Sequence, residues 1–531
     1  MASAGTDHAA AAADTIPRDY NFAADILARN LTAGRAGKPA FIDARGAWTY
    51  GQVAERVDRF GALLRVLGVQ REQRVLICLL DTIDWPTAFL GTIKAGAVAV
   101  PVNTLMTEDD YRFILADSRA QALVVSEALY PKFAGLLGGA PNLKQVIVSG
   151  KVTSRHPGIG HHAFEDALEQ AHPDGITAAT TRDDIAFWLY TSGSTGKPKG
   201  AVHIHANPRL TDELYGGPIV GLTEHDVCFS VAKLFFAYGL GNALTFPMSA
   251  GATTILLADR PTPDAVAEIL RKHNVTVFYG VPTFYAGFLA SPALPAREDL
   301  KLRCCVSAGE ALPLDVGRRW SARFGVDILD GLGSTEMLHI FLSNRAGDVK
   351  YGASGKRVPG YDLKIVDDDG AIAPPGDMGE LCVRGPTSAI MYWNNRAQSR
   401  ATFQGEWTRT GDKYIEDEQG VFTYCGRRDD MLKVSGMYVS PFEVEGALLT
   451  HSDVLEAAVV AWRDQDGLVK PKAFIVLKGG AAGDALARAL QDHVKAALAP
   501  YKYPRWIEFC ADLPKTATGK IQRFKLRDPK A

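Results

Sequence analysis

The strongest chemical signal in the sequence is YTSGSTGKPKG, residues 190–200, which follows the apolar run IAFWL. Its glycines allow close backbone approach to an oxyanion, its hydroxyls can donate hydrogen bonds and its lysines add positive charge. It is not a Walker A loop, because only two residues separate Gly193 from Gly196 and Lys197 precedes a proline. These features predict a polyphosphate cradle. Its candidate residues are Thr191, Ser192, Gly193, Ser194, Thr195, Gly196, Lys197 and Lys199.

Further polar motifs follow this loop along the chain. They are SAGEAL (307–312), DGLGSTE (330–336), TGD (410–412), YCGRRDDMLKVSG (424–436) and PKTATGK (514–520). With the loop, and in this order, they resemble the signature motifs of the adenylate-forming superfamily, which includes acyl-CoA synthetases, peptide-synthetase adenylation domains and beetle luciferases. The resemblance covers about residues 40–525, nearly the whole chain.

The resemblance implies ATP and Mg²⁺ as ligands, because attack of a carboxylate on a phosphate needs positive charge or a metal. In relatives the counterpart of Glu336 helps to hold Mg²⁺ and that of Thr335 approaches the α-phosphate; here Gly333 and Ser334 complete the turn. Asp412 and Arg427 would bind the ribose. The walls around adenine would be Ala308, Gly309, Glu310, Asp330, Gly331 and Leu332.

The resemblance also implies coenzyme A as cosubstrate and a C-terminal domain that moves. Lys520 would reach the reacting oxygens during adenylation, although a lysine near a chain end is by itself usually surface charge. Because a thiol must later attack from the same side, the small domain should rotate, with Asp429 at the hinge. Lys433, Ser435 and Gly436 would then approach coenzyme A, and Lys433 is a candidate for thioester formation.

The segment KLFFAYGLG (233–241) occupies the acid-binding position of this family. Aromatic rings beside small residues suit a flat pocket for an aromatic guest, although core packing is the plain alternative. Together with STEMLHIFLSN (334–344), the segment resembles the benzoate–CoA ligase branch, which implies benzoate as substrate. The candidate acid-binding residues are Phe236, Ala237, Tyr238, Gly239, Gly331, His339 and Ile340.

Other functions remain open at this point. Another small aryl acid such as 4-hydroxybenzoate, or a medium-chain acid, could be the substrate. A peptide-synthetase adenylation module is disfavoured because no Asp stands in FFAYG, and a long-chain acyl-CoA synthetase because the segment is aromatic. A luciferase is disfavoured because the sequence ends in DPKA rather than Ser-Lys-Leu. A nucleotide-binding regulator without turnover is disfavoured by Lys520, Glu336 and Asp412. His203 and His205 could suggest a metal site, but no further ligand completes it.

The motifs need a scaffold that places them together. Apolar runs separated by helical patterns predict parallel sheets covered on both faces in a large α/β body. After residue 350, polar alternation and glycine turns predict a small antiparallel sheet or barrel, and beyond residue 426 a compact α+β piece follows. The expected strands are 74–80, 96–102, 121–126, 144–149, 186–192, 276–282, 303–310, 455–462 and 472–478, with helices at 442–451 and 485–498.

Length and composition agree with such an enzyme. The chain has 531 residues, 47% of them hydrophobic, and a net charge of −2, which gives no reason to expect nucleic acid or a membrane as partner. Seven scattered cysteines suit the cytoplasm, and the oligomeric state, a homodimer included, is left open. The predicted divisions are a disordered segment at 1–20, an N-terminal domain at 21–426, a hinge at 427–430 and a mobile C-terminal domain at 431–531.

Overall fold

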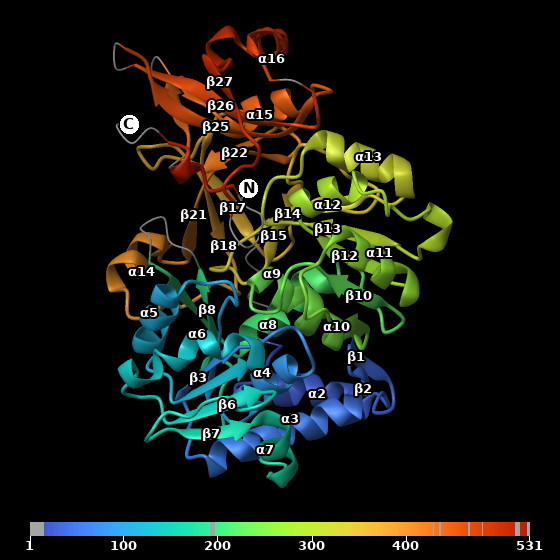
Figure 1. Ribbon diagram of the computed structural model, residues 1–531, viewed down its shortest axis with the longest axis vertical. Coiled ribbons are helices and arrows are strands. Elements are labelled where there is room, and N and C mark those ends of the chain that lie inside the picture. Colours follow the sequence, from blue (N-terminus) through green and yellow to red (C-terminus); the bar gives the residue numbers. More distant parts are fainter. Residues whose placement is uncertain are drawn as a thin grey trace.

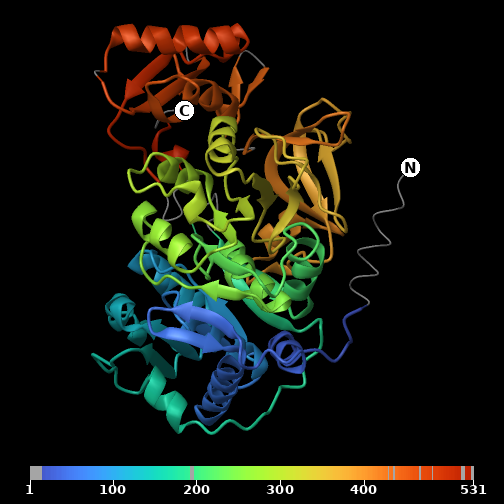
Figure 2. The same ribbon diagram turned by 90° about the vertical axis from the view of Figure 1, so that its right-hand side faces the viewer.

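The computed structural model describes residues 15–191, 197–427, 430–434, 437–465, 468–480, 482–515 and 521–527. Two α/β units follow one another along the long axis of the molecule, and a C-terminal lobe lies at the far end (Figure 1). An antiparallel sheet lies beside the second unit (Figure 2). The predicted class, a large α/β body with a smaller C-terminal α+β part, is confirmed.

The first unit is built on an eight-stranded sheet whose central strands are parallel and buried on both faces. Val75 and Ile77 of β3 pack into one apolar cluster, whereas Leu76 and Cys78 pack into another on the opposite face. This two-sided burial explains the unbroken apolar runs of the sequence. The strand order is β19 (Met391–Tyr392), β9 (Lys199–Ile204), β8 (Ile185–Thr191), β4 (Val98–Pro101), β3 (Arg74–Cys78), β5 (Ala122–Ser126), β6 (Gln145–Ser149) and β7 (Gly160–Ala163).

The second unit is a nine-stranded sheet with the same construction. Tyr279 and Phe278, neighbours in β12, belong to clusters on opposite faces. The middle strands are parallel and the edges are antiparallel. The order is β16 (Lys356–Arg357), β15 (Ile340–Ser343), β14 (Ile328–Gly333), β13 (Cys304–Ser307), β12 (Val277–Gly280), β10 (Val227–Ser230), β11 (Thr253–Ile255), β1 (Pro39–Asp43) and β2 (Gly46–Thr49).

Helices cover these sheets, and several begin at side-chain caps. Thr49 and Gln52 form a capping box at the start of α3. The longer helices are α2 (Phe22–Thr32), α3 (Tyr50–Val66), α4 (Asp84–Lys94), α5 (Glu108–Ser118), α11 (Pro263–Lys272), α12 (Pro282–Leu289) and α13 (Leu314–Phe324). Shorter ones are α6 (Pro131–Ala134), α7 (Phe164–Gln170), α8 (Ala206–Thr211), α9 (Ala237–Leu240), α10 (Phe246–Ala250) and α14 (Arg396–Thr402).

The predicted antiparallel part after residue 350 is confirmed as a five-stranded sheet. In β22, Phe422 and Gly426 are buried while Thr423 and Arg427, on the opposite face, are exposed, although Cys425 on that face is buried as well. Its strands are β17 (Asp362–Val366), β18 (Gly379–Arg384), β20 (Phe403–Gln404), β21 (Trp407–Glu416) and β22 (Phe422–Arg427).

The C-terminal lobe has a core of its own. β25 (Val454–Arg463) and β26 (Val469–Leu477) are antiparallel, and β27 (Trp506–Phe509) is parallel to β26. Helix α15 (Pro441–Leu449) and α16 (Asp484–Ala497) pack on this sheet, and α16 buries only Leu490 and Val494. A short hairpin, β23 (Leu432–Val434) and β24 (Met437–Val439), contributes Leu432 to the same core.

One predicted boundary is wrong. Residues 15–20 were expected in a disordered segment, but Ile16 and Tyr20 are buried in the core of the first unit, and Asp19 forms a β-bridge with Thr181. Residues 1–14 lie outside the described part of the chain. No helix among the described residues is long and apolar enough to cross a membrane. All seven cysteines are free thiols.

Candidate active site

A cavity of about 560 Å³ opens where the two α/β units meet the antiparallel sheet, and most of the predicted site residues line it. The predicted residues among its walls are Thr191, Lys199, Phe236, Ala237, Tyr238, Ala308, Gly309, Glu310, Gly333, Ser334, Thr335, Glu336, His339, Ile340, Asp412 and Arg427. Segments more than 200 residues apart therefore come together at one place.

The glycine-rich loop connects two antiparallel strands, β8 and β9, rather than a strand and a helix. Thr191 and Lys199 stand opposite each other at its base and both line the cavity. The ammonium of Lys199 lies 5.0 Å from the ring centroid of Tyr392. Lys197 does not line the cavity; its ammonium lies 5.4 Å from the ring of Phe113. Residues Ser192, Gly193, Ser194, Thr195 and Gly196 lie outside the described part of the chain.

Glu336 lies in the turn between β14 and β15, and two contacts fix its position. The hydroxyl of Tyr392 donates to Oε1 of Glu336 at 2.5 Å, and the backbone N–H of Ala389 donates to its carbonyl oxygen at 2.7 Å. The preceding carbonyl oxygen, of Thr335, accepts from Nε2 of His203 at 2.8 Å. Glu336 itself lines the cavity, and no described residue donates to its Oε2.

Asp412 and Arg427 form an ion pair at the edge of the same cavity. Strands β21 and β22 place the two residues directly opposite each other, and Nη1 of Arg427 lies 3.0 Å from Oδ1 of Asp412. The carboxylate of Asp412 is the main cause of the raised pKa of Arg427. Asp412 is buried and Arg427 is exposed, so the pair presents both an acceptor and donors to a polar ligand.

The two expected adenine walls differ in position. Ala308, Gly309 and Glu310 line the cavity, and Gly309 has φ of +95°, a conformation that favours glycine. Asp330, Gly331 and Leu332 lie in β14 but do not line the cavity. Asp330 is buried, its Oδ2 accepts from the N–H of Leu312 at 3.4 Å, and burial raises its pKa to about 8.

The expected acid-binding wall is formed at the start of α9 and in the turn before β15. Phe236, Ala237, Tyr238, His339 and Ile340 all line the cavity, and the ring centroids of Tyr238 and His339 lie 5.6 Å apart, whereas Gly239 and Gly331 are not part of the lining. The hydroxyl of Tyr238 donates toward the carbonyl oxygens of Gly280 and Val306, at 3.1 and 3.2 Å. The phenol is thus already engaged by the sheet, which leaves its ring for an apolar guest.

His339 is a buried neutral imidazole in an aromatic surrounding. Its ring lies 4.5 to 5.6 Å from the rings of Tyr215, Tyr238 and Phe246, and Nε2 lies 3.1 Å from Oδ1 of Asn242. Burial lowers its pKa to about 3. Asn242 belongs to a π-helical turn, Gly241–Thr245, and such turns often occur at functional sites.

Sequence reasoning missed several cavity residues. Thr410 and Gly411 could have been found, since they belong to the TGD motif. Tyr392 lies in no recognised motif; it reaches Glu336 because β19 pairs with β9. The others are Ala232, Val281, Leu338, Glu380, Gln398, Ala401, Thr402, Gln404 and Arg409.

Part of the predicted site cannot be placed. Lys520, Asp429, Ser435 and Gly436 lie outside the described residues, and of Lys433 only the backbone in β23 is described. The histidine pair is structural, as expected: Nδ1 of His205 accepts from the N–H of Phe22, and His203 bonds Thr335. The described residues contain no cluster of three or more metal-binding side chains.

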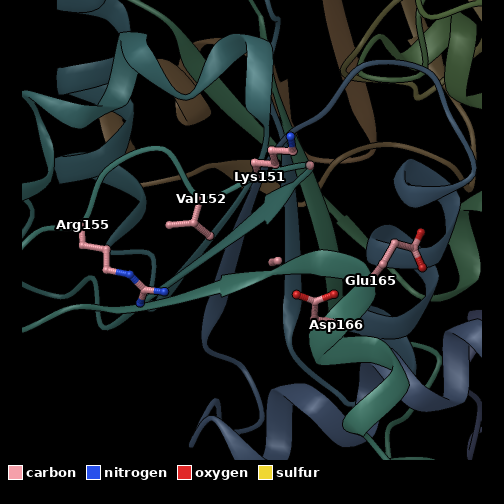
Figure 3. A pocket seen from close by; sticks show the side chains of 7 residues that line it. Lys151, Val152, Arg155, Glu165 and Asp166 are labelled. Carbon is pink, nitrogen blue, oxygen red and sulfur yellow. The ribbon is translucent and has the colours of Figure 1, made fainter.

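A second cavity lies in the first unit, and its lining residues precede the glycine-rich loop in the chain. Lys151, Val152 and Arg155 on one side and Glu165 and Asp166 on the other line it (Figure 3). Both signs of charge face this space, and Glu165 is already paired with Arg45 and Arg56. None of its residues belongs to a predicted site.

Comparison with known proteins agrees with this geometry. The family profile described as AMP-binding enzyme matches residues 28–393, and the profile of its C-terminal domain matches residues 443–520. The benzoate–CoA ligase of Thauera aromatica is 60% identical over 96% of each chain, and the 4-hydroxybenzoate–CoA/benzoate–CoA ligase of Rhodopseudomonas palustris is 49% identical over 96% of this chain and 94% of its own.

A solved structure is similarly close. The benzoate CoA ligase of Burkholderia xenovorans LB400 is 54% identical, with a TM-score of 0.89 over 96% of this chain and all of that one. The resemblance predicted from the motifs is confirmed, and this chain belongs to the family of AMP-binding, adenylate-forming enzymes.

Proposed function

We propose that this protein ligates benzoate to coenzyme A with ATP, through a benzoyl-adenylate. A carboxylate oxygen of benzoate attacks the α-phosphorus and releases pyrophosphate; the thiolate sulfur of coenzyme A then attacks the acyl carbon and releases AMP. The observation that carries the proposal is the single cavity in which the aromatic wall Phe236–Tyr238 meets the polar groups Thr335, Glu336 and Asp412. The 60% identity to a benzoate–CoA ligase supports it.

The polar end of the cavity would bind ATP. Asp412 and Arg427 would bind the ribose hydroxyls, and Thr191, Lys199, Thr335 and the glycine-rich loop would bind the phosphates. The walls Ala308–Glu310 and Asp330–Leu332 would enclose adenine, the latter from behind the lining. Preorganised donors at the α-phosphate stabilise the charge that develops there, which is the main task of such a site.

Mg²⁺ fits the donor set of the site. Glu336 lines the cavity with one oxygen held by Tyr392, and Mg²⁺ is commonly bound by one or two carboxylates together with substrate phosphates. Bound there with ATP, Mg²⁺ would neutralise phosphate charge. The protein's own contribution is to hold Glu336 at a fixed place and Thr335 beside it.

The acid would lie with its ring against Tyr238, Ala237 and Ile340. Aromatic contacts contribute about 0.5–1.5 kcal/mol beyond area burial. The hydroxyl of Tyr238 and Nε2 of His339 already have partners, and only Nδ1 of His339 is left without one among the described residues. A para-hydroxyl group that does not reach this nitrogen would lose water without a replacement, at a cost of roughly 1–3 kcal/mol. Benzoate should therefore be preferred to 4-hydroxybenzoate.

The second step would need the C-terminal lobe in another orientation. We place the hinge at 427–430, with Asp429 as pivot, between the N-terminal domain and a mobile domain at 431–531. Lys520 would serve adenylation, and Lys433, Ser435 and Gly436 would serve thioester formation. The packing of Leu432 to Phe509 into a separate core supports a lobe that can turn as one piece. Action in the cytoplasm, as monomer or homodimer, is consistent with free thiols.

The test is ATP–pyrophosphate exchange with benzoate, 4-hydroxybenzoate, cinnamate and octanoate, followed by detection of the CoA thioester. Benzoate should give the highest kcat/KM, roughly tenfold or more above 4-hydroxybenzoate. Faster exchange with octanoate would contradict the pocket assignment. Failure to form AMP with any of the acids would contradict the whole proposal.

A further inference from the structure

The wall that carries Phe236, Ala237 and Tyr238 is the loop of residues 232–240, whose last four residues form the single helical turn α9, and contacts from other elements hold it in place. The loop turns sharply, since the N–H of Phe236 donates to the carbonyl of Lys233 at 3.0 Å. Gly239 packs against that same carbonyl, and a Cβ there would lie only 2.0 Å from it. The shape of the wall therefore depends on how residues 233 and 234 are anchored.

Asp81 provides one anchor from a different part of the fold. It follows β3 of the first sheet, is only 5% exposed, and its carboxylate accepts from the N–H of Leu234 at 3.3 and 3.4 Å. A carboxylate at that depth is costly to bury without compensation. Asp81 thus joins the first α/β unit to the loop at the acid-binding wall of the second.

Lys233 provides the second anchor. Its ammonium donates to the carbonyl oxygens of Leu257 and Asp259, residues that follow β11, the latter at 2.8 Å. Its positive charge is the main electrostatic effect that favours the ionised form of Asp81. The backbone between Ala232 and Phe236 is therefore held by the carboxylate of Asp81 on one side. On the other side the ammonium of Lys233 bonds it to the residues that follow β11 of the nine-stranded sheet.

We propose that Asp81 is a positioning residue for the acid substrate: its carboxylate, together with Lys233, fixes the loop that presents Phe236 and Tyr238 to the ring of the acid. The inference rests on the proposed function and adds to it a residue that does not touch the substrate. Asp81 does not line the cavity, whereas four residues of the loop, Ala232, Phe236, Ala237 and Tyr238, do.

The arrangement also makes benzoate binding depend on pH. Burial raises the pKa of Asp81 to about 6, against the attraction of Lys233 and the hydrogen bond from Leu234. Above that pH the carboxylate is charged and holds the loop. Below it, protonation removes the charge and weakens both the hydrogen bond from Leu234 and the attraction to Lys233. The KM for benzoate should rise as the pH falls through about 6, whereas Asp81 by itself would make the fold more stable in the same range.

Asp81→Asn tests the inference, because the side chain keeps its size and loses its charge. We expect the KM for benzoate at about pH 8 to rise about tenfold, with the KM for ATP and kcat within about threefold of the parent. At about pH 5 the two proteins should have similar KM values for benzoate, since Asp81 is then protonated in the parent.

The matched control is Asp43→Asn. Asp43 is also buried and accepts a backbone N–H from the same loop after β3, that of Ile83 at 2.9 Å, and its other hydrogen bonds come from Arg45 and Trp48. It should leave the KM for benzoate unchanged. Lys233→Met tests the second anchor independently and should raise the KM for benzoate without changing that for ATP.

The outcomes separate the two proposals. If the parent protein forms no AMP with benzoate, the proposed function fails. If the parent is active but Asp81→Asn raises the KM for ATP as much as that for benzoate, or has the same effect as Asp43→Asn, Asp81 is only a structural residue and the inference is overturned. If the KM for benzoate still depends on pH in Asp81→Asn, the inference that this dependence comes from the titration of Asp81 is overturned.

Discussion

The hydroxyl of Tyr392 donates to Oε1 of Glu336 at 2.5 Å, although the two residues are 56 positions apart in sequence. Tyr392 is buried, with 3% of its surface exposed, and its ring lies beneath the ammonium of Lys199. Burial, reinforced by the carboxylate of Glu336, raises the pKa of the Tyr392 hydroxyl, so it remains a donor at neutral pH. The phenol thus fixes one oxygen of Glu336, the carboxylate proposed to bind Mg²⁺.

Tyr392→Phe should therefore weaken the binding of Mg²⁺ without removing any side chain that would bind the metal. Partners that orient a metal-binding carboxylate are commonly worth about 10–100-fold in affinity. We expect the Mg²⁺ concentration for half-maximal AMP formation to rise about tenfold. Calorimetric ATP binding should show the same loss with Mg²⁺ present and no difference with EDTA.

The control for this variant is Tyr361→Phe, which removes another buried hydroxyl, bonded to Thr387 at 3.0 Å, outside the cavity lining. It should lower thermal stability and leave the Mg²⁺ dependence unchanged. An unchanged Mg²⁺ requirement in Tyr392→Phe would show that Glu336 needs no such support.

Asp412→Asn should raise the KM for ATP selectively. A hydrogen bond from a ribose hydroxyl to a carboxylate is worth roughly 1.5–3 kcal/mol, against about 0.5–1.5 kcal/mol for one to a neutral amide, so an increase of about tenfold is expected. The KM for benzoate should not change. Asp368→Asn is the control, because Asp368 pairs with Lys413, the next residue in β21, away from the cavity. Equal effects of the two substitutions would argue against ribose binding by Asp412.

Lys520→Ala should separate the two half-reactions. An ammonium placed where charge develops can be worth several kcal/mol, so adenylate formation should fall at least a hundredfold. The rate of thioester formation from supplied benzoyl-adenylate, measured as the loss of free thiol, should stay within about threefold of the rate of the parent. Lys525→Ala, five residues on at an exposed position, should affect neither step. Comparable losses in both steps would contradict the rotation of the C-terminal lobe.

The sequence predicted the elements that combine strong periodicity with complete burial. The runs at β3, β5 and β6 are apolar because both sheet faces are covered, so consecutive residues are apolar and the strands can be recognised in the sequence. The hairpin β8–β9 was not predicted, because strand direction depends on pairing and not on local pattern. Residues 15–20 were assigned to disorder because they follow an alanine-rich stretch. Ile16 and Tyr20, which are buried in the core, are isolated among polar residues and form no apolar pattern in the sequence.

The site residues that could be predicted are those that lie in motifs recognisable in the sequence. Thr335, Glu336 and Asp412 lie in short polar motifs between apolar strands, and the structure brings them to one cavity. Tyr392 and Asp81 could not be predicted in this way. Each acts through a partner distant in sequence, Glu336 in one case and Leu234 in the other, so only the folded arrangement shows the connection.

Asp330→Asn should change the pH dependence of stability in a defined direction. Burial raises the pKa of Asp330 to about 8, whereas an Asp in an unfolded chain titrates near about 3.9. Between about pH 4 and pH 8 the folded protein retains a proton that the unfolded chain has lost, so the contribution of Asp330 to stability falls as the pH rises. The penalty is absent below that window and complete above it. Asp212, with a pKa of about 7, and Asp81 act in the same direction, so the parent alone cannot isolate one group.

The difference between the parent and Asp330→Asn isolates it, because the amide has a similar shape and no charge. In the absence of ATP, the unfolding midpoint of the variant relative to the parent should rise by several degrees from about pH 5 to about pH 9, which corresponds to a stability difference on the order of a few kcal/mol. Asp327→Asn, in the same stretch of chain but with its carboxylate at the surface beside Tyr351, should show no such trend. A relative midpoint for Asp330→Asn that stays constant with pH, or falls, would mean that Asp330 is ionised in the folded protein and that a donor or cation compensates its burial.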